Sequence, residues 1–172
     1  MQLTHAEHKP GQEKFPLILV TDNIFSDANI GSLFRLADAF NIEKIIFGGT
    51  RPNLESNRLR KTARDTHKTV HFEFSEETTS AIHNLKEEGY RILALEITFD
   101  STPIEKYNFA QGSKIVLLVG NERHGIENNV LKMADEKVYI KMFGNNSSMN
   151  VSQAAGIAFY EITKSLLLFQ KK

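Results

Sequence analysis

The sequence predicts a single α/β domain, built on a mostly parallel β-sheet flanked by helices. Two observations point to this class: short β-rich runs alternate with helical patterns, and several of the β-rich runs are almost entirely apolar. The strands of a parallel sheet are covered on both faces, so apolar residues are expected on both sides of them. With 172 residues, of which 41% are hydrophobic and 24% charged, the chain is long enough for one sizeable core.

Six segments have the length and composition of strands. Ile115–Val119, for example, contains only isoleucine, valine and leucine, as expected for a strand buried on both faces. The six expected strands are Leu17–Thr21, Lys44–Phe47, Val70–Phe74, Arg91–Leu95, Ile115–Val119 and Val138–Ile140.

Three segments between and after these strands have helical periodicity. Residues 29–40 place Ile30, Leu33, Phe34, Ala37 and Phe40 on one stripe, and Thr79–Glu88 ends before Gly89, which stands in the usual position of a helix C-cap. The last helix is the clearest, with a regular apolar stripe and small residues that allow another backbone to approach. Its stripe consists of Val151, Ala154, Ala155, Ala158, Ile162, Leu166 and Phe169.

Composition bounds the organisation and the location of the protein. Residues 1–14 are polar, with Pro10 and Gly11, and are expected to form a loose leader, while residues 15–172 form the single domain. The chain has no cysteine, which excludes disulfides and thiolate metal sites, and it has no apolar N-terminal run or membrane-spanning stretch. A cytoplasmic location is therefore expected. A net charge of +0 argues against a protein whose whole surface binds nucleic acid but is compatible with a local basic patch.

Three segments rich in small and polar residues lie beside predicted strands or helices, at residues 29–37, 118–126 and 144–152. Ligands of open α/β sheets bind outside the carboxyl ends of the strands, so these segments predict a binding site there. The usual nucleotide fingerprints are missing, since no G-x-G-x-x-G follows the first strand and no G-x-x-x-x-G-K-[ST] occurs. A Rossmann dehydrogenase and a P-loop enzyme are therefore disfavoured.

Taken together, the three segments resemble the SpoU, or TrmH-type, branch of the SPOUT family of RNA ribose 2′-O-methyltransferases. Asn29-Ile30-Gly31 with Arg35 and Ala37 is similar to the first motif of that family, and Val119–Glu122 with Gly125 to the second. Met142–Gly144, followed by Ser148–Ser152 and Tyr160-Glu161, is similar to the third. The sequence departs from the family pattern at Lys141, where proline is usual, and at Met149, where leucine is usual.

The resemblance implies a C-terminal trefoil knot, with S-adenosylmethionine bound in a bent form among the knotted loops. Knots are otherwise nearly absent from proteins, so this expectation depends on the resemblance alone. The resemblance also implies a homodimer that pairs around the last helix and the first-motif helix, bringing Asn29 and Arg35 of one subunit near the cofactor of the other. The residues that would hold the cofactor are Leu95, Glu96, Gly120, Asn121, Ile140, Met149 and Asn150.

The candidate catalytic residues are Arg35, Asn29, Glu122, Ser148 and Asn150. The Arg35 guanidinium could grip a phosphate or stabilise a developing 2′-oxyanion, and the family resemblance suggests it as proton acceptor, although arginine does not normally release its proton. The alternative is a surface arginine paired with Asp38. Glu122 could bond Asn29 or Arg35, or simply close its turn. Ser148 and Asn150 could bind the cofactor carboxylate or the ribose, or cap the last helix.

The stretch from Arg51 to Lys68 has six basic and two acidic residues, a local charge of +4. Such a run is usually a solvated face, but this one follows the second strand at the expected ligand edge, which favours contact with an RNA backbone. His67 and His71 are four residues apart but lack a third ligand, so no metal is expected. The expected RNA-binding residues are Arg51, Arg58, Arg60, Lys61 and Arg64.

These observations predict an S-adenosylmethionine-dependent tRNA or rRNA 2′-O-methyltransferase, with RNA as its partner and no metal or membrane. Three alternatives stay open: a catalytically silent RNA-binding relative, which should lack Arg35 or Asn150, a base methylase of another SPOUT branch, and a nucleotide-binding regulator. Which RNA is methylated is left open by the sequence. Surplus apolar residues of the last helix predict a homodimer, unless the leader covers them. They are Ile157, Phe159, Leu167 and Leu168.

Overall fold

The computed structural model describes residues 11, 14–110 and 112–170, and its centre is a seven-stranded sheet of order β3-β2-β1-β6-β4-β7-β5. All of the strand pairings are parallel, so every strand ends at the same edge of the sheet. The strands are β1 (Phe15–Asp22), β2 (Ile42–Gly48), β3 (Phe72–Ser75), β4 (Arg91–Leu95), β5 (Thr102–Pro103), β6 (Ile115–Val119) and β7 (Glu136–Tyr139).

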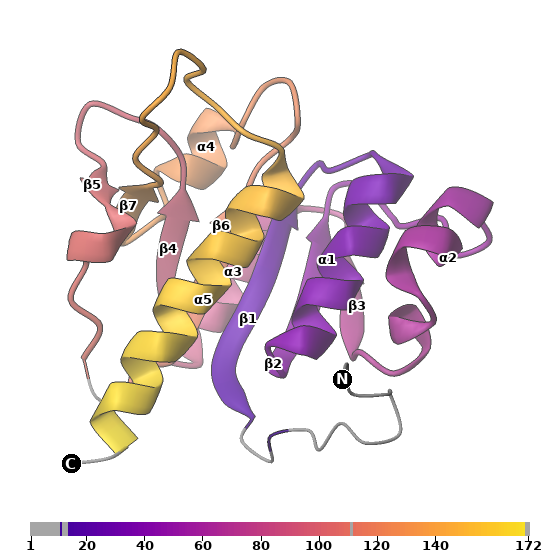
Figure 1. Ribbon diagram of the computed structural model, residues 1–172, viewed down its shortest axis with the longest axis horizontal. Helices are drawn as coiled ribbons and strands as arrows, with labels where there is room; N and C mark the ends of the chain where they lie inside the picture. Colours follow the sequence, from indigo (N-terminus) through magenta and orange to yellow (C-terminus); the bar gives the residue numbers. More distant parts are fainter. Residues whose placement is uncertain (1–10, 12–13, 111, 171–172) are drawn as a thin grey trace, which may run out of the picture.

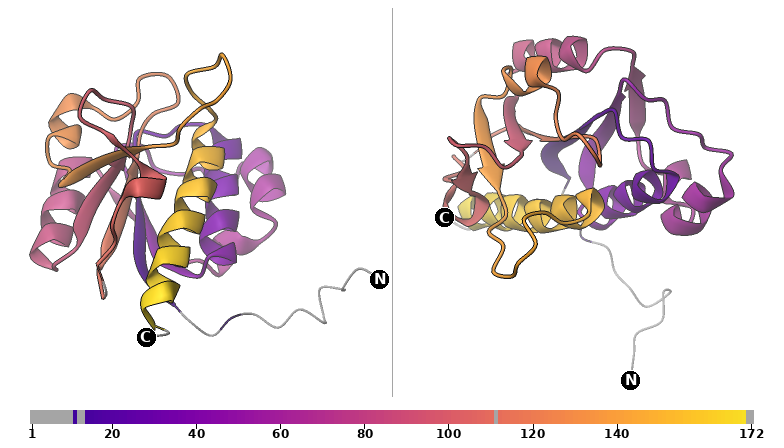
Figure 2. Two further views of the ribbon diagram at one scale, coloured as in Figure 1. Left: turned by 60° about the vertical axis from the view of Figure 1, so that its left-hand side comes forward. Right: turned by 90° about the horizontal axis from the view of Figure 1, so that it is seen from above.

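Helices cover both faces of the sheet. Helices α1, α2 and α5 lie on one face, and α3 and α4 on the other (Figures 1 and 2). The α-helices are α1 (Asp27–Ala39), α2 (Asn57–Ala63), α3 (Thr78–Glu87), α4 (Asn128–Leu131) and α5 (Val151–Gln170), with 3₁₀ turns η2 (Thr66–Lys68) and η3 (Ile104–Lys106).

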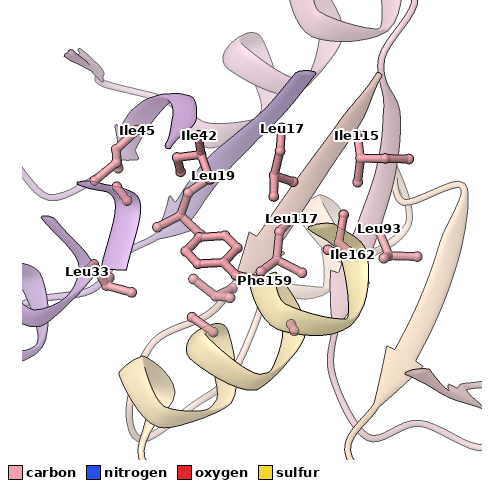
Figure 3. Packing of buried hydrophobic residues seen from close by; sticks show 14 of the residues in the cluster. Leu17, Leu19, Leu33, Ile42, Ile45, Leu93, Ile115, Leu117, Phe159 and Ile162 are labelled. Atoms are coloured by element: carbon pink, nitrogen blue, oxygen red, sulfur yellow. The ribbon is translucent and has the colours of Figure 1, made fainter. Parts of the chain in front are cut away.

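The apolar strands divide their side chains between two cores. In β1, Leu17 and Leu19 face the core under α1 and α5, whereas Ile18 and Val20 face the core under α3 and α4. Successive side chains of a strand point to opposite faces, which explains why the central strands are apolar throughout. Phe159 of α5 is fully buried in the first of these cores and points toward the sheet (Figure 3).

Helices α1 and α2 are held together by a close approach at Gly31. An ideal Cβ built on Gly31 would lie 2.0 Å from Thr62 Oγ1 and 2.5 Å from the Leu59 carbonyl oxygen. The start of α2 is also tied to α1, because Ser56 Oγ donates to Asp27 Oδ2 at 2.6 Å. The glycine of the first motif thus has a packing role at this contact.

The predicted α/β class, the parallel sheet and its flanking helices are confirmed, and all six expected strands and three expected helices are found with ends that differ by at most two residues. Three elements escaped prediction: β5, which has two residues, and the short helices α2 and α4. Helix α2 buries only Leu59 and Ala63, one turn apart, which is too little periodicity to detect.

Not every expectation from the sequence is confirmed by the structure. The trefoil knot and the division into a leader and a single domain stay predictions, and nearly all of the leader lies outside the described residues. The assignment of Phe159 to the surplus apolar face of the last helix is wrong, because its side chain packs under the sheet and next to the ring of Phe40. Within the described part of the chain, no helix is long and apolar enough to cross a membrane.

We expect Gly31→Ala to lower the free energy of unfolding by about 1–3 kcal/mol, because the added methyl group overpacks a backbone contact that has no free volume. Chemical denaturation measures this loss. Gly11→Ala is the matched control: a Cβ there meets nothing within 4 Å, so its stability should stay within about 0.5 kcal/mol of the parent chain. Equal stability of the two variants would contradict the packing role of Gly31.

Candidate active site

Loops at the carboxyl edge of the sheet enclose a cavity of about 530 Å³, within the range typical of small-molecule sites. The loops that follow β4, β6 and β7 contribute to it, together with the first turns of α1 and α5. These loops gather above the carboxyl ends of the strands (Figure 1). All seven residues expected to bind the cofactor line the cavity, as do Asn29, Glu122, Ser148 and Asn150 of the expected catalytic set.

A chain of side-chain hydrogen bonds joins the three motif segments on one wall of the cavity. Asn29 Nδ2 donates to Glu122 Oε1 at 2.9 Å, and Asn150 Nδ2 donates to Asn29 Oδ1 at 2.9 Å. Asn29 is only 9% exposed, so both ends of its amide are used inside the protein. The expected bond between Glu122 and Asn29 is therefore present, and it extends to Asn150.

Glu122 also supports the start of α1. Its carboxylate accepts hydrogen bonds from the backbone N–H groups of Ser26, at 3.1 Å, and Phe25, at 3.5 Å. The Ser26 side chain makes no capping bond at this helix N-terminus. A carboxylate near the first turn of a helix satisfies free N–H groups and is favoured by the helix dipole. Glu122 thus acts as a cap supplied from a distant loop, a role its position in the sequence did not indicate.

Asn150 caps the last helix. Its Oδ1 accepts hydrogen bonds from the backbone N–H of Ser152, at 2.9 Å, and that of Gln153, at 3.4 Å, as expected for an N-cap residue. Asn150 therefore has both expected roles: its Oδ1 caps the helix, and its Nδ2 donates to Asn29 Oδ1 in the site. Ser148 does not cap the helix; it is exposed at the cavity wall.

The loop from Gly120 to Gly125 is closed by its own backbone. Asn121 and Gly125 exchange N–H···O bonds of 2.9 Å, and a Cβ on Gly120 would lie 2.2 Å from the backbone nitrogen of Ile126. Glycine is therefore needed at position 120 because any side chain would collide with the backbone that closes the loop, whether or not a ligand is bound. Glu96 Oε2 accepts from the Ile126 N–H at 3.1 Å, so this cavity residue also holds the loop.

Arg35 is the one expected catalytic residue that does not line the cavity of its own chain. It lies on α1 six residues beyond Asn29, and its side chain is exposed. The alternative interpretation, a surface pair with Asp38, is not observed, since Arg35 makes no ion pair with any described residue. Asn29, in contrast, lies at the cavity of its own chain.

The basic run lies apart from the cavity in one chain, because α2 is on the far side of α1 from the loop 140–150 (Figure 1). Arg60 pairs with Glu55, and the Arg51 guanidinium lies 4.2 Å from the centre of the Phe74 ring. The exposed residues Arg58, Lys61 and Arg64 make no ion pair with any residue the structure describes. Local contacts therefore occupy two of the five expected RNA-binding residues.

Several residues of the cavity wall were missed by the sequence reasoning, although most are direct neighbours of motif residues. Arg123 and Gly125 stand in the second motif, Ser147 directly precedes Ser148 of the third, and Val151 lies within the third. Ile97 and Tyr139 had no signal beyond their places at the ends of strands. Among the residues that the structure describes, no cluster of histidine, aspartate and glutamate side chains could hold a metal ion.

We expect Asn150→Ser and Asn150→Ala to separate the two roles of this residue. Serine is a good N-cap but is too short to reach Asn29, whereas alanine provides neither contact, so the alanine variant should be about 1 kcal/mol less stable. Denaturant unfolding of both variants measures the difference. If both variants lose the same stability, Asn150 does not cap α5.

Comparisons with known proteins establish the family and the fold. Residues 16–160 match the SpoU rRNA Methylase family. Over 148 residues the chain is 27% identical to the tRNA (guanosine(18)-2′-O)-methyltransferase of Aquifex aeolicus, a match that covers 84% of this chain and 67% of that protein. Over 152 residues it is 28% identical to the 23S rRNA (guanosine-2′-O-)-methyltransferase RlmB of Acinetobacter baylyi, covering 88% and 60%. The chain spans about half to two thirds of the length of the curated relatives it matches.

Solved structures share the fold. The TrmH/SpoU tRNA modifying enzyme of A. aeolicus superposes with a TM-score of 0.78 at 26% identity, covering 87% of this chain and 75% of that one. An AdoMet-bound rRNA methyltransferase of Sinorhizobium meliloti has the same fold, with a TM-score of 0.81 at 21% identity, covering 90% and 58%. Because the family match extends over most of the chain, from the first strand into the last helix, this protein belongs to the SpoU family of RNA methylases.

Proposed function

We propose that this protein transfers a methyl group from S-adenosylmethionine to the 2′-hydroxyl of a ribose in tRNA or rRNA. The observation that carries the proposal is the hydrogen-bond chain Glu122–Asn29–Asn150, which joins residues of all three motifs on one wall of the cavity. Membership of the SpoU family and the activities stated in the names of the two relatives support it. A cytoplasmic location is part of the same proposal.

The cavity fits the cofactor in size and in chemistry. S-adenosylmethionine, when bound, supplies a methyl group on a positively charged sulfur. Apolar side chains of Leu95, Ile140 and Met149 line the cavity beside polar groups such as Ser148, a mixture that suits a ligand with an adenine ring and a charged amino-acid end. Backbone groups of these segments would hold the adenine and ribose, and the Ser148 hydroxyl would hold the cofactor carboxylate or the acceptor ribose.

The protein's own part in the reaction is alignment and charge stabilisation. Asn29 is locked between Glu122 and Asn150, so its amide keeps one orientation at the cavity wall. Arginine does not normally release its proton, so the role of the Arg35 guanidinium is to stabilise the negative charge that develops on the 2′-oxygen, while the hydroxyl proton passes to solvent.

In this proposal the protein is a homodimer, and each cavity receives Arg35 from the partner subunit. Arg35 is exposed on α1 and does not line its own cavity, and α5, in the same layer, exposes apolar side chains. Ile157 is 40% exposed and Leu168 61% exposed, which favours a partner over this surface. A second copy that pairs through α1 and α5 would bring Arg35 of one subunit to the cavity of the other.

The other functions have less support. A catalytically silent relative is disfavoured because Arg35 and Asn150 are both present and Asn150 is bonded into the site. A nucleotide-binding regulator has no need of Arg35, and comparing the affinity of S-adenosylmethionine with that of other nucleotides tests it. Mapping 2′-O-methyl sites in RNA from cells with and without the protein tests the main proposal.

Arg35→Ala should lower the methylation rate about a hundredfold or more and leave the cofactor affinity nearly unchanged, because the guanidinium acts mainly in the transition state. Single-turnover methylation and calorimetric cofactor titration measure the two quantities. Arg91→Ala is the control, since Arg91 pairs with Glu136 at the start of β4, away from the carboxyl edge of the sheet. Full activity of the Arg35 variant would exclude this residue from the reaction.

Mixing Arg35→Ala subunits with Asn150→Ala subunits tests the shared site. Each heterodimer would contain one intact site, so random mixing should restore roughly a quarter of the parent activity. Unmixed variants provide the baseline. If mixing restores no activity although heterodimers form, each subunit uses only its own residues.

Replacing Arg58, Lys61 and Arg64 together by glutamine should weaken RNA binding and lower the slope of log affinity against log salt by roughly 2, as expected for three lost phosphate contacts to single-stranded RNA. Lys68→Gln is the control, because Lys68 pairs with Asp65. An unchanged salt slope would assign the three residues to an ordinary solvated face.

A further inference from the structure

A second feature at the rim of the cavity, outside the hydrogen-bond chain, is the pair Phe25 and Arg123. The Arg123 guanidinium carbon lies 5.6 Å from the centre of the Phe25 ring. Phe25 is 50% exposed, and Arg123 lines the cavity. The pair therefore presents an aromatic ring and a positive charge side by side at the rim of the cavity.

The backbone beneath this pair is held on both sides. The Phe25 N–H points to Glu122 Oε2 at 3.5 Å, and the Arg123 N–H donates to Asn121 Oδ1 at 2.9 Å. Asn121 Nδ2 also donates to the Asn23 carbonyl oxygen at 2.7 Å, which ties the two loops together. The aromatic ring thus stands on loops that are cross-linked to each other and to the residue that holds Asn29.

The other exposed phenylalanine rings among the described residues lack this support. Phe143 lies close to Lys141, at 5.3 Å from ring centre to ammonium nitrogen, but residues 141–149 make no hydrogen bond to any described residue. Phe99 is fully exposed on the loop after β4 and has no cation over its ring among the described residues. A platform that positions a substrate has to be rigid, which singles out Phe25.

We propose that Phe25, backed by Arg123, is the stacking platform for the base of the RNA nucleotide that enters the site. Unpaired RNA bases stack on aromatic side chains, and a neighbouring guanidinium adds cation–π attraction and a partner for the phosphate. Because the backbone N–H of Phe25 and the side chain of Asn29 both donate to Glu122, the ring stands on the loop next to the catalytic wall, and a base stacked on it would bring its ribose toward that wall. This inference rests on the proposed function and identifies a residue that positions its substrate.

The chain contains no tryptophan, so Phe25→Trp introduces a single fluorescent reporter at the proposed platform. An unstructured RNA decamer of mixed sequence should quench its emission saturably, whereas polyphosphate of the same charge, which has no bases, should not. Phe99→Trp is the matched control and should respond to neither. Equal responses of the two tryptophans to RNA, or no quenching at position 25, would overturn the proposal.

Affinity measurements complete the test. Phe25→Leu keeps an apolar side chain but removes the ring, and should bind the decamer about tenfold more weakly, within the range known for one base–aromatic stack. Phe25→Tyr should bind like the parent, and cofactor affinity should be the same in all three proteins. An unchanged RNA affinity of Phe25→Leu would show that the ring does not stack on a base. The same conclusion would follow if the emission of the Phe25→Trp variant shifted on protein dilution and not with RNA.

These readouts measure base stacking and need no turnover. If the assays detect no base stacking at position 25 but the protein methylates RNA, only the role of Phe25 is overturned. Stacking without methylation of any RNA would overturn only the proposed function. The two proposals therefore fail separately.

Discussion

The arrangement of this site depends on one constraint: the Glu122 carboxylate has to satisfy several donors from a segment that lies about a hundred positions away in the sequence. It accepts from the backbone at the start of α1 and from the Asn29 side chain, whose amide oxygen in turn accepts from Asn150. Hydrogen bonds to a charged group are stronger than those between neutral groups, and leaving one partner unsatisfied is costly. The orientation of α1, the loop after β6 and the start of α5 are all tied to this group.

In this protein the same residues therefore hold the loops in place and contribute to the site. Asn150 caps α5 with its oxygen and holds Asn29 with its nitrogen, and Asn121 fixes the backbone of its own loop while binding that of Asn23. Glu96 lines the cavity and also accepts from the Ile126 N–H. Residues that hold a site in this way allow a cavity wall made of loops to keep a defined shape.

The surfaces around the cavity differ in charge and polarity, and each suits a different binding partner. The α1–α5 layer exposes Arg35 together with apolar side chains of α5, which suits a second copy of the chain. The rim near Phe25 and Arg123 combines a ring with a charge, which suits a base and its phosphate. The exposed cations of α2 lie beyond α1, so an RNA that reaches both α2 and the cavity of one chain has to cover a wide surface.

The sequence by itself determined the α/β class, the positions of the long strands and helices, and the family, because apolar periodicity and motif spacing are local properties. It also identified part of the cavity wall, through the family resemblance and because polar segments follow strands that end at one edge. Only the tertiary structure decided that Phe159 is buried, that Asn29 bridges Glu122 and Asn150, and that Arg35 does not line the cavity of its own chain. These outcomes depend on which faces of α1 and α5 meet the sheet and on contacts between residues about a hundred positions apart, neither of which local patterns encode.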